Sequence, residues 1–201
     1  MTNIEILQAF VSGEMPFEEF KEIYFSNQSL QDFLQEKLPK SMLEVKFADF
    51  SKGINSVLQK KSWDTKFGKL GIHCIIKMWL KENSIDFTST EVYHDEYSFL
   101  IKVMPDCVHG DKAEALVDNI IQGVPEAIGK AKRIKEIKGK IKDAFHLNDG
   151  KKPRWPQDTD WPFSKSGKPL KYVSQKSDGD LVMLTFTDVD IGETVVVEDY
   201  Y

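Results

Sequence analysis

The chain ends in three runs of strand-forming residues that are separated by two tight-turn signals. Residues 170–175 and 180–187 flank Asp178-Gly179, and Asp and Gly both tolerate the positive φ angles that two-residue hairpins require. A second turn signal at residues 190–193 precedes the valine-rich run at 194–200. This pattern predicts a three-stranded antiparallel meander at the C-terminus.

One face of the predicted sheet is apolar and needs cover. Val182, Leu184 and Phe186 occupy every second position of the second strand, so their side chains share one face. An isolated three-stranded sheet is marginally stable in water, and we therefore expect it to pack on the rest of the chain. The proline-locked aromatic segments at 153–156 and 161–163 are the predicted contacts.

Apolar residues at helical spacing predict helices over most of the first 150 residues. Thr2 and Glu5 have the spacing of a capping box at the first helix. Pro16 suits the first position of a second helix, and Pro39 is predicted to end a third, before a poorly patterned stretch. The widest apolar stripe predicts a helix that ends at Asn83-Ser84, and it comprises Ile72, Ile75, Ile76, Trp79 and Leu80.

Three further elements are predicted between residues 97 and 150. Residues 97–103 alternate between apolar and polar types, which predicts a strand. Asp111 and Glu114 indicate the start of a helix that ends near Gly123. Pro125 is predicted to open a longer helix, whose apolar stripe comprises Ile134, Ile137, Ile141 and Phe145.

These elements predict an α+β fold, with a helical N-terminal body and a C-terminal three-stranded antiparallel β-meander. The 201 residues, 41% of them hydrophobic, are enough to form a sizeable core. We expect a mainly helical body over residues 1–150 and a Trp/Pro linker with the meander over 151–201. The two parts are expected to form one compact unit.

Several features predict a cytoplasmic protein. No apolar run approaches the roughly 20 residues that cross a bilayer, and the acidic N-terminus lacks the pattern of a secretory signal. Cys74 and Cys107 are too few for a disulfide framework, so both are expected to be reduced thiols.

The motifs of common enzyme classes are incomplete. His94-Asp95-Glu96 matches the H-x-E of zinc deaminases, but Cys107 is not followed by the second cysteine of that motif. The segment 123–130 has five residues between its glycines, one too many for a phosphate-binding loop. Adjacent residues point about 100° apart on a helix, so His73 and Cys74 cannot face each other. We expect Cys74 near the apolar face of its helix and His73 at the polar boundary. The sequence predicts no catalytic residue, metal site or cofactor.

Charge is unevenly distributed along the chain, whose formal net charge is −5. Residues 130–154 contain ten basic and three acidic groups, which gives +7 and leaves −12 for the remainder. A basic helix can hold phosphates. Here, however, the lysines alternate with an isoleucine stripe, as in a helix with one buried and one solvated face. Aromatic residues are not interleaved among them, so nucleic acid is an unlikely partner.

The C-terminal segment is acidic. From Lys176 onward, one basic residue stands against seven acidic ones, five of which follow the second predicted strand. Acidic residues in hairpin turns are usually turn chemistry, but complementary charge also attracts and selects a basic partner. Trp155 and Trp161 are either core residues or partner anchors. The candidate partner-binding residues are therefore Asp188, Asp190, Glu193, Glu198, Asp199, Trp155 and Trp161.

The C-terminal quarter resembles a group of immunity proteins from bacterial polymorphic-toxin and contact-dependent inhibition systems. The resemblance rests on PRWPQDTDWPF, GKPLKYVSQ and LTFTDVDIGETVVVEDYY, in that order, and more loosely on FVSGEMPFEEF and Gly71-Ile72-His73. Residues 164–166 make one loop longer than in that group. The resemblance implies a cytoplasmic protein that neutralises a cognate toxin, often a basic nuclease, without catalysis of its own. It transfers no catalytic residue.

The leading hypothesis is accordingly a non-catalytic, immunity or antitoxin-like binding protein. Two alternatives remain open. One is a small enzyme whose site is assembled from dispersed residues, and the other is a nucleic-acid-associated module that uses the basic segment 130–154.

Overall fold

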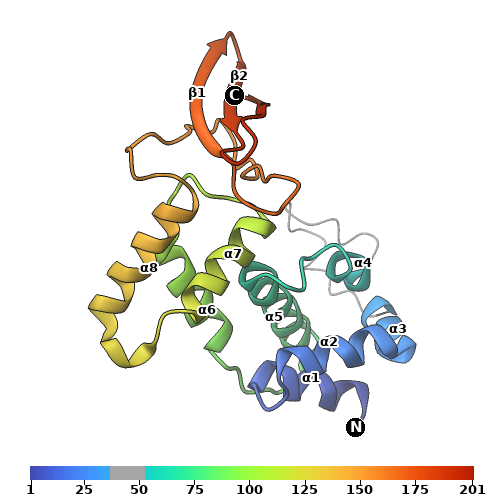
Figure 1. The fold of residues 1–201 in the computed structure, drawn as a ribbon. Helices are drawn as coiled ribbons and strands as arrows, with labels where there is room; N and C mark the ends of the chain where they lie inside the picture. The colour runs from blue at the N-terminus through green and yellow to red at the C-terminus, as the bar shows by residue number, and fades with distance from the viewer. Residues whose placement is uncertain (37–52) are drawn as a thin grey trace. The chain divides into compact units, whose positions relative to one another are not determined.

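The computed structural model describes residues 1–36 and 53–201 and has an α+β fold with a C-terminal antiparallel sheet (Figure 1). The chain separates into two compact units, Met1–Ser98 and Phe99–Tyr201. The predicted boundary at residue 150 lies within the second unit. Among the described helices, none is both long and apolar enough to cross a lipid bilayer.

The first unit is helical, and its helices begin where the sequence predicts. In α1 (Asn3–Ser12), the Thr2 side chain accepts from the Glu5 backbone N–H, and Glu5 caps Thr2 in return, which confirms the capping box. Pro16 immediately precedes α2 (Phe17–Ser26). The remaining helices are α3 (Gln28–Glu36), α4 (Ile54–Leu58) and α5 (Lys66–Glu82), and the predicted helix end at Pro39 lies outside the described residues.

Aromatic side chains form the core of the first unit. Phe10 is fully buried and stacks on Phe20, with ring centroids 4.0 Å apart. Trp63 stacks on Tyr24 at 4.7 Å, and its indole N–H donates to the Leu58 carbonyl at 3.0 Å. The indole is therefore buried without leaving its one polar atom unpaired.

The strand predicted at residues 97–103 is wrong, because this segment is part of α6 (Val92–Val103). The buried residues of α6 are Tyr93, Leu100 and Val103, whose spacings of seven and three are helical. Ile101, which the strand pattern would bury, is 54% exposed. The alternation was too short to distinguish the two-residue period of a strand from the 3.6-residue period of a helix.

The second unit continues with two helices that cover its core. The helix predicted from Asp111 is confirmed as α7 (Asp111–Gln122), and Gly123 caps its end. Pro125 starts only the 3₁₀ turn η3 (Glu126–Ile128). The longer helix, α8 (Lys130–Ala144), begins five residues later than predicted, because Gly129 has a φ of 85° that interrupts the helical backbone.

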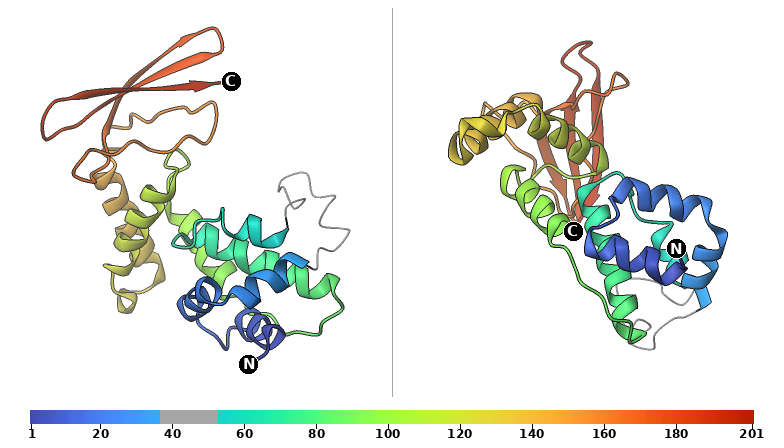
Figure 2. Two further views of the ribbon diagram at one scale, coloured as in Figure 1. Left: turned by 90° about the vertical axis from the view of Figure 1, so that its right-hand side faces the viewer. Right: turned by 90° about the horizontal axis from the view of Figure 1, so that it is seen from below.

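The predicted meander is confirmed. Its strands are β1 (Lys171–Asp178), β2 (Leu181–Thr187) and β3 (Thr194–Tyr200), paired antiparallel in the order β1-β2-β3 (Figures 1 and 2). The first loop consists of Gly179 and Asp180, one residue later than predicted, with a φ of 60° at Gly179. Positive φ at the first loop position matches the type II′ hairpin turn.

The two faces of the sheet differ in polarity. Val182, Leu184 and Phe186 are fully buried, as predicted from their alternation. The register places Val195 opposite Phe186 and Val197 opposite Leu184, so these two valines of β3 lie on the same, inner face. The Trp/Pro segment packs on this inner face through Trp155 and Trp161.

Candidate functional site

The five acidic candidates lie at two ends of the sheet. Asp188, Asp190 and Glu193 belong to the turn between β2 and β3, whereas Glu198 and Asp199 lie near the end of β3. At about 3.3 Å per residue, Glu193 and Glu198 are roughly 17 Å apart along the strand. The structure therefore brings together three of the five.

Backbone hydrogen bonds fix the turn that carries these three carboxylates. The Asp188 N–H donates to the Glu193 carbonyl at 2.8 Å, and the Gly192 N–H donates to the Asp188 carbonyl at 2.8 Å. The Asp188 carboxylate accepts from the Asp190 N–H at 3.0 Å. Asp188 thus shapes the turn, while the side chains of Asp190 and Glu193 remain exposed.

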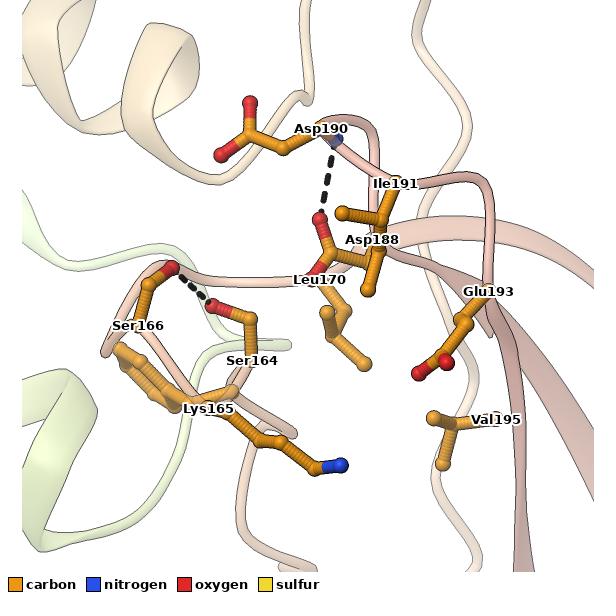
Figure 3. A pocket seen from close by; sticks show the side chains of 10 residues that line it. Ser164, Lys165, Ser166, Leu170, Asp188, Asp190, Ile191, Glu193 and Val195 are labelled. Atoms are coloured by element: carbon orange, nitrogen blue, oxygen red, sulfur yellow. Dashed lines mark hydrogen bonds between the residues drawn. The ribbon is translucent and has the colours of Figure 1, made fainter.

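These carboxylates border an apolar pocket of about 470 Å³. Its apolar lining comprises Phe163, Leu170, Ile191 and Val195. Figure 3 shows the carboxylates of Asp190 and Glu193 on opposite sides of Ile191, which is 64% exposed. An exposed isoleucine between carboxylates combines an apolar centre with a charged surround, an arrangement that protein interfaces share.

The turn at residues 164–168 forms the opposite wall of the pocket. The Ser164 and Ser166 hydroxyls are hydrogen-bonded at 2.8 Å (Figure 3). The Lys168 N–H donates to the Ser164 hydroxyl at 3.1 Å. Neither histidine nor cysteine lines the pocket. The serine hydroxyls are therefore engaged in their own turn, with no adjacent imidazole to activate them.

An ion pair connects the turn at residues 164–168, the serine turn, to the turn between β2 and β3, the acidic turn. The Lys168 ammonium lies 2.7 Å from an Asp190 carboxylate oxygen. The hydrogen bond that the Lys168 ammonium donates to the Asp190 carboxylate raises the pKa of Lys168. Lys168 thereby offsets part of the negative charge at this end of the sheet.

Asp199 has a structural role. It is 5% exposed, and its carboxylate accepts from the Gln157 backbone N–H at 3.2 Å and from the Tyr200 N–H at 2.9 Å. These bonds hold the Trp/Pro segment against β3. Glu198 is exposed on the outer face, opposite Met183.

Both tryptophans are packing residues of the second unit. Trp161 is 2% exposed, lies edge-on to Phe145 and Phe186, and donates its indole N–H to the Leu170 carbonyl at 3.0 Å. Trp155 is half-buried, stacks on Phe186 at 5.7 Å and donates to the Cys107 carbonyl at 2.8 Å. Of the two alternatives that the sequence left open, these contacts favour the core role.

The expected orientation of His73 and Cys74 is wrong. His73 is 3% exposed and its Nε2 lies 3.1 Å from the Val11 carbonyl, whereas Cys74 is exposed. Burial lowers the pKa of the His73 imidazole. The apolar stripe of α5 is wide enough to include position 73, where the α1 backbone offers a hydrogen-bond acceptor.

The basic helix α8 has one buried and one solvated face. Ile137 and Ile141 are fully buried, and Arg133 is held by the Glu126 carboxylate at 2.9 Å and the Val124 carbonyl at 3.1 Å. The lysines that remain exposed to solvent include Lys132, Lys135, Lys138, Lys140 and Lys142. This arrangement fits the helix pattern read from the sequence.

Residue-by-residue reading of the sequence missed the apolar part of the pocket and its serine wall. Leu170, Ile191 and Val195 come from three different segments, so no local pattern groups them. One signal was available: Ile191 is an apolar residue inside an acidic turn. Turns normally expose polar residues, and an apolar one there indicates either a buried turn or a contact surface.

Among residues 1–36 and 53–201, no three His, Cys, Asp or Glu side chains are grouped so as to hold a metal ion. Comparison with known proteins gives no relative: no family model, no curated protein and no solved structure matches the chain.

Proposed function

We propose that this protein is a non-catalytic binding protein of the immunity or antitoxin class, which neutralises a basic protein toxin in the cytoplasm. The observation that carries the proposal is the pocket bounded by β3, the acidic turn and the serine turn. It combines an exposed apolar surface at Ile191 and Val195 with carboxylates at Asp188, Asp190 and Glu193.

The apolar surface extends beyond the pocket, which favours a protein over a small molecule as the ligand. Val195 and Val196 are 40% and 54% exposed, and Val189, just before Asp190, is 51% exposed. Val195 and Val196 lie on opposite faces of β3, so apolar side chains are exposed on both sides of this edge strand, where another macromolecule can cover them. The carboxylate rim would then select a partner of positive charge.

The electrostatics of the C-terminal segment support a basic partner. Residues 176–201 carry one basic and seven acidic groups. A surface of one sign raises the rate at which an oppositely charged protein associates, and this effect weakens as salt screens it. Many nuclease toxins are basic because they bind phosphates, and an acidic inhibitor can cover such an active site.

The resemblance of the Trp-Pro and meander segments to immunity proteins supports the same assignment. The side-chain chemistry of the pocket is compatible with it, because the pocket offers contact surface and charge without an activated nucleophile. Two free cysteines are compatible with a reducing compartment.

The test is an association-rate measurement with a basic toxin domain, sought first among the products of neighbouring genes. The triple variant Asp188→Asn, Asp190→Asn and Glu193→Gln should associate about tenfold more slowly at low salt, because the steering charge is lost. The difference should shrink at high salt. Growth protection against the toxin should weaken in parallel.

A matched control removes the same charge elsewhere. Glu22, Glu82 and Asp86 are exposed acidic residues of the first unit, and their amide substitutions should leave the rate within about twofold. Equal slowing by both triple variants would mean that net charge, and not the pocket, governs association. Substrate turnover by the purified protein would contradict the proposal as a whole.

A further inference from the structure

The two edges of the sheet are built differently. The β1 edge carries Lys171 and Lys176, and Val173 forms a bulge that interrupts its register with β2. Lysines and bulges are the usual protection of an edge strand against pairing with another chain. In contrast, β3 pairs with β2 through seven consecutive residues without a bulge, and it contains three successive valines.

Hydrogen bonds at both ends of β3 define which of its backbone groups face away from β2. The Asp188 N–H donates to the Glu193 carbonyl, and the Tyr201 N–H donates to the Asp180 carbonyl. Asp188 with Glu193 and Asp180 with Tyr201 are therefore hydrogen-bonded pairs of one antiparallel register. Such pairs alternate along a ladder. The N–H and C=O groups of Thr194, Val196 and Glu198 therefore point away from the sheet.

The last outward-facing position of β3 is already occupied. The Tyr200 N–H donates to the Asp199 carboxylate at 2.9 Å, and the Tyr200 carbonyl accepts from the Gln157 side chain at 3.2 Å. Within residues 1–36 and 53–201, no corresponding backbone partner is found for the outward groups of Thr194, Val196 and Glu198. An open edge about 13 Å long remains, enough for roughly five residues of another chain.

We propose that an extended basic segment of the protein partner adds to β3 as a fourth strand. This inference rests on the proposed function, because it specifies how the acidic, apolar surface engages its partner. Main-chain hydrogen bonds to Thr194, Val196 and Glu198 provide the pairing, and alternate side chains of the added strand provide the selectivity.

The pocket determines what the added strand presents on the inner face. Val195 lies on that face and lines the pocket, so the residue of the added strand beside Val195 would reach toward Leu170 and Ile191. An apolar side chain fits there. On the outer face, Glu198 favours a basic neighbour, and basic residues near the β2–β3 turn would meet Asp190 and Glu193.

Charge argues against a second copy of this chain as the fourth strand. Antiparallel pairing of two β3 strands would bring Asp190 and Glu193 of one copy toward Glu198, Asp178 and Asp180 of the other. Like charges that meet across strands are destabilising. A basic segment reverses the sign of each of these interactions.

The test uses a fluorescent nine-residue peptide of alternating lysine and valine as the probe. Val196→Pro removes one outward N–H without removing a hydrogen bond to β2, which edge strands tolerate. It should weaken peptide binding about tenfold or more, because the ladder is broken at its centre. Val196→Thr keeps the N–H and the branched side chain, and it should bind like the wild type.

Amide exchange measured by NMR gives an independent readout. With bound peptide, the amides of Thr194, Val196 and Glu198 should exchange more slowly, whereas those of Val195 and Val197, already bonded to β2, should change little. Circular dichroism and thermal unfolding of both Val196 variants establish that the sheet is retained.

The outcomes separate this inference from the proposed function. Equal binding by Val196→Pro and wild type, together with loss of binding in the Asp188, Asp190 and Glu193 amide variant, would overturn strand addition and leave recognition of a basic partner intact. Slower exchange with no effect of the amide variant would support strand addition and contradict the carboxylate-based function. A wild-type dimer that Val196→Pro dissociates would identify a second copy as the occupant, and absence of peptide binding to the wild type would also overturn the inference.

Discussion

The two units of this protein differ in how many of their apolar side chains are exposed to solvent. The first unit encloses an aromatic cluster in which Phe10, Phe20 and Tyr24 are fully buried. In the second, apolar side chains reach the solvent at the sheet. Of the twelve large apolar side chains exposed among the described residues, seven lie between Val173 and Tyr201. Most of the exposed large apolar side chains therefore belong to the second unit, at and around its sheet.

Backbone hydrogen bonding explains this difference. A helix satisfies its internal N–H and C=O groups within one segment, so a bundle is complete once its apolar stripes are buried. A short sheet always leaves two edges with unpaired groups. The protein protects one edge with Lys171, Lys176 and the Val173 bulge, and leaves the other available at Thr194, Val196 and Glu198.

The largest expected effect tests whether the first unit is a scaffold. Phe10→Ala removes a ring that stacks on Phe20 and contacts Phe17, Tyr93 and His73, and it should lower the free energy of unfolding by about 3–5 kcal/mol. Chemical denaturation followed by tryptophan fluorescence measures this change. At temperatures where the variant is folded, peptide binding at β3 should be unchanged.

A control for Phe10 is Val92, which is 52% exposed. Val92→Ala should change stability by less than about 0.5 kcal/mol. If Phe10→Ala also abolished peptide binding while the protein remained folded, the distinction between scaffold and binding surface would fail.

The second prediction concerns pH and again belongs to the first unit. Burial lowers the pKa of His73 below the ordinary value of 6.5, so the unfolded chain binds a proton more readily than the native one. The contribution of neutral His73 to stability is therefore complete above pH 6.5 and is lost as pH falls below it, with a slope of at most about 1.4 kcal/mol per pH unit. Unfolding curves recorded between pH 5 and pH 7 measure this slope.

His73→Gln keeps a donor for the Val11 carbonyl and removes the titration, so it should flatten the pH dependence. His94 is exposed, and His94→Gln should leave the slope as in the wild type. The same slope in both variants would mean that groups other than His73 control acid stability.

The smallest expected effect concerns the second unit. Lys168→Gln removes the cation that pairs with Asp190, which makes this end of the sheet more negative. Association with a basic partner should become roughly two- to threefold faster at low salt. Stopped-flow mixing measures the rate. Lys165 lines the pocket and forms no ion pair within residues 1–36 and 53–201. Lys165→Gln therefore removes a charge without breaking a pair, and comparing the two variants separates pairing with Asp190 from overall charge. Slower association of Lys168→Gln would show that the lysine itself contacts the partner.

Local patterns were sufficient for much of the fold. The Asp178-Gly179 signal and the alternation of Val182, Leu184 and Phe186 determine the meander, because turn chemistry and side-chain period are local properties. The Thr2 capping box and the helix from Asp111 are confirmed for the same reason. The strand predicted at 97–103 failed because a short alternation is weak evidence, and the buried positions of this segment, Leu100 and Val103, follow the helical spacing that begins at Tyr93.

The candidate site was predicted less completely. Charge counting found Asp188, Asp190 and Glu193, but it also included Asp199, which the Gln157 N–H engages from 42 residues away in the chain. Charge counting could not distinguish the buried carboxylate of Asp199 from the carboxylates at the pocket, since the role of a carboxylate depends on which donors the fold brings to it. The immunity-protein assignment stays a prediction.

By itself, the sequence determined the strands, the turns and the acidic character of the C-terminal segment, because these follow from residue types within a few positions of each other. The tertiary structure decided which apolar residues became core and which became surface. Trp161 is enclosed by Phe145 and Phe186, whereas Ile191 and Val195 are left open, since burial depends on the segments that distant parts of the chain place alongside.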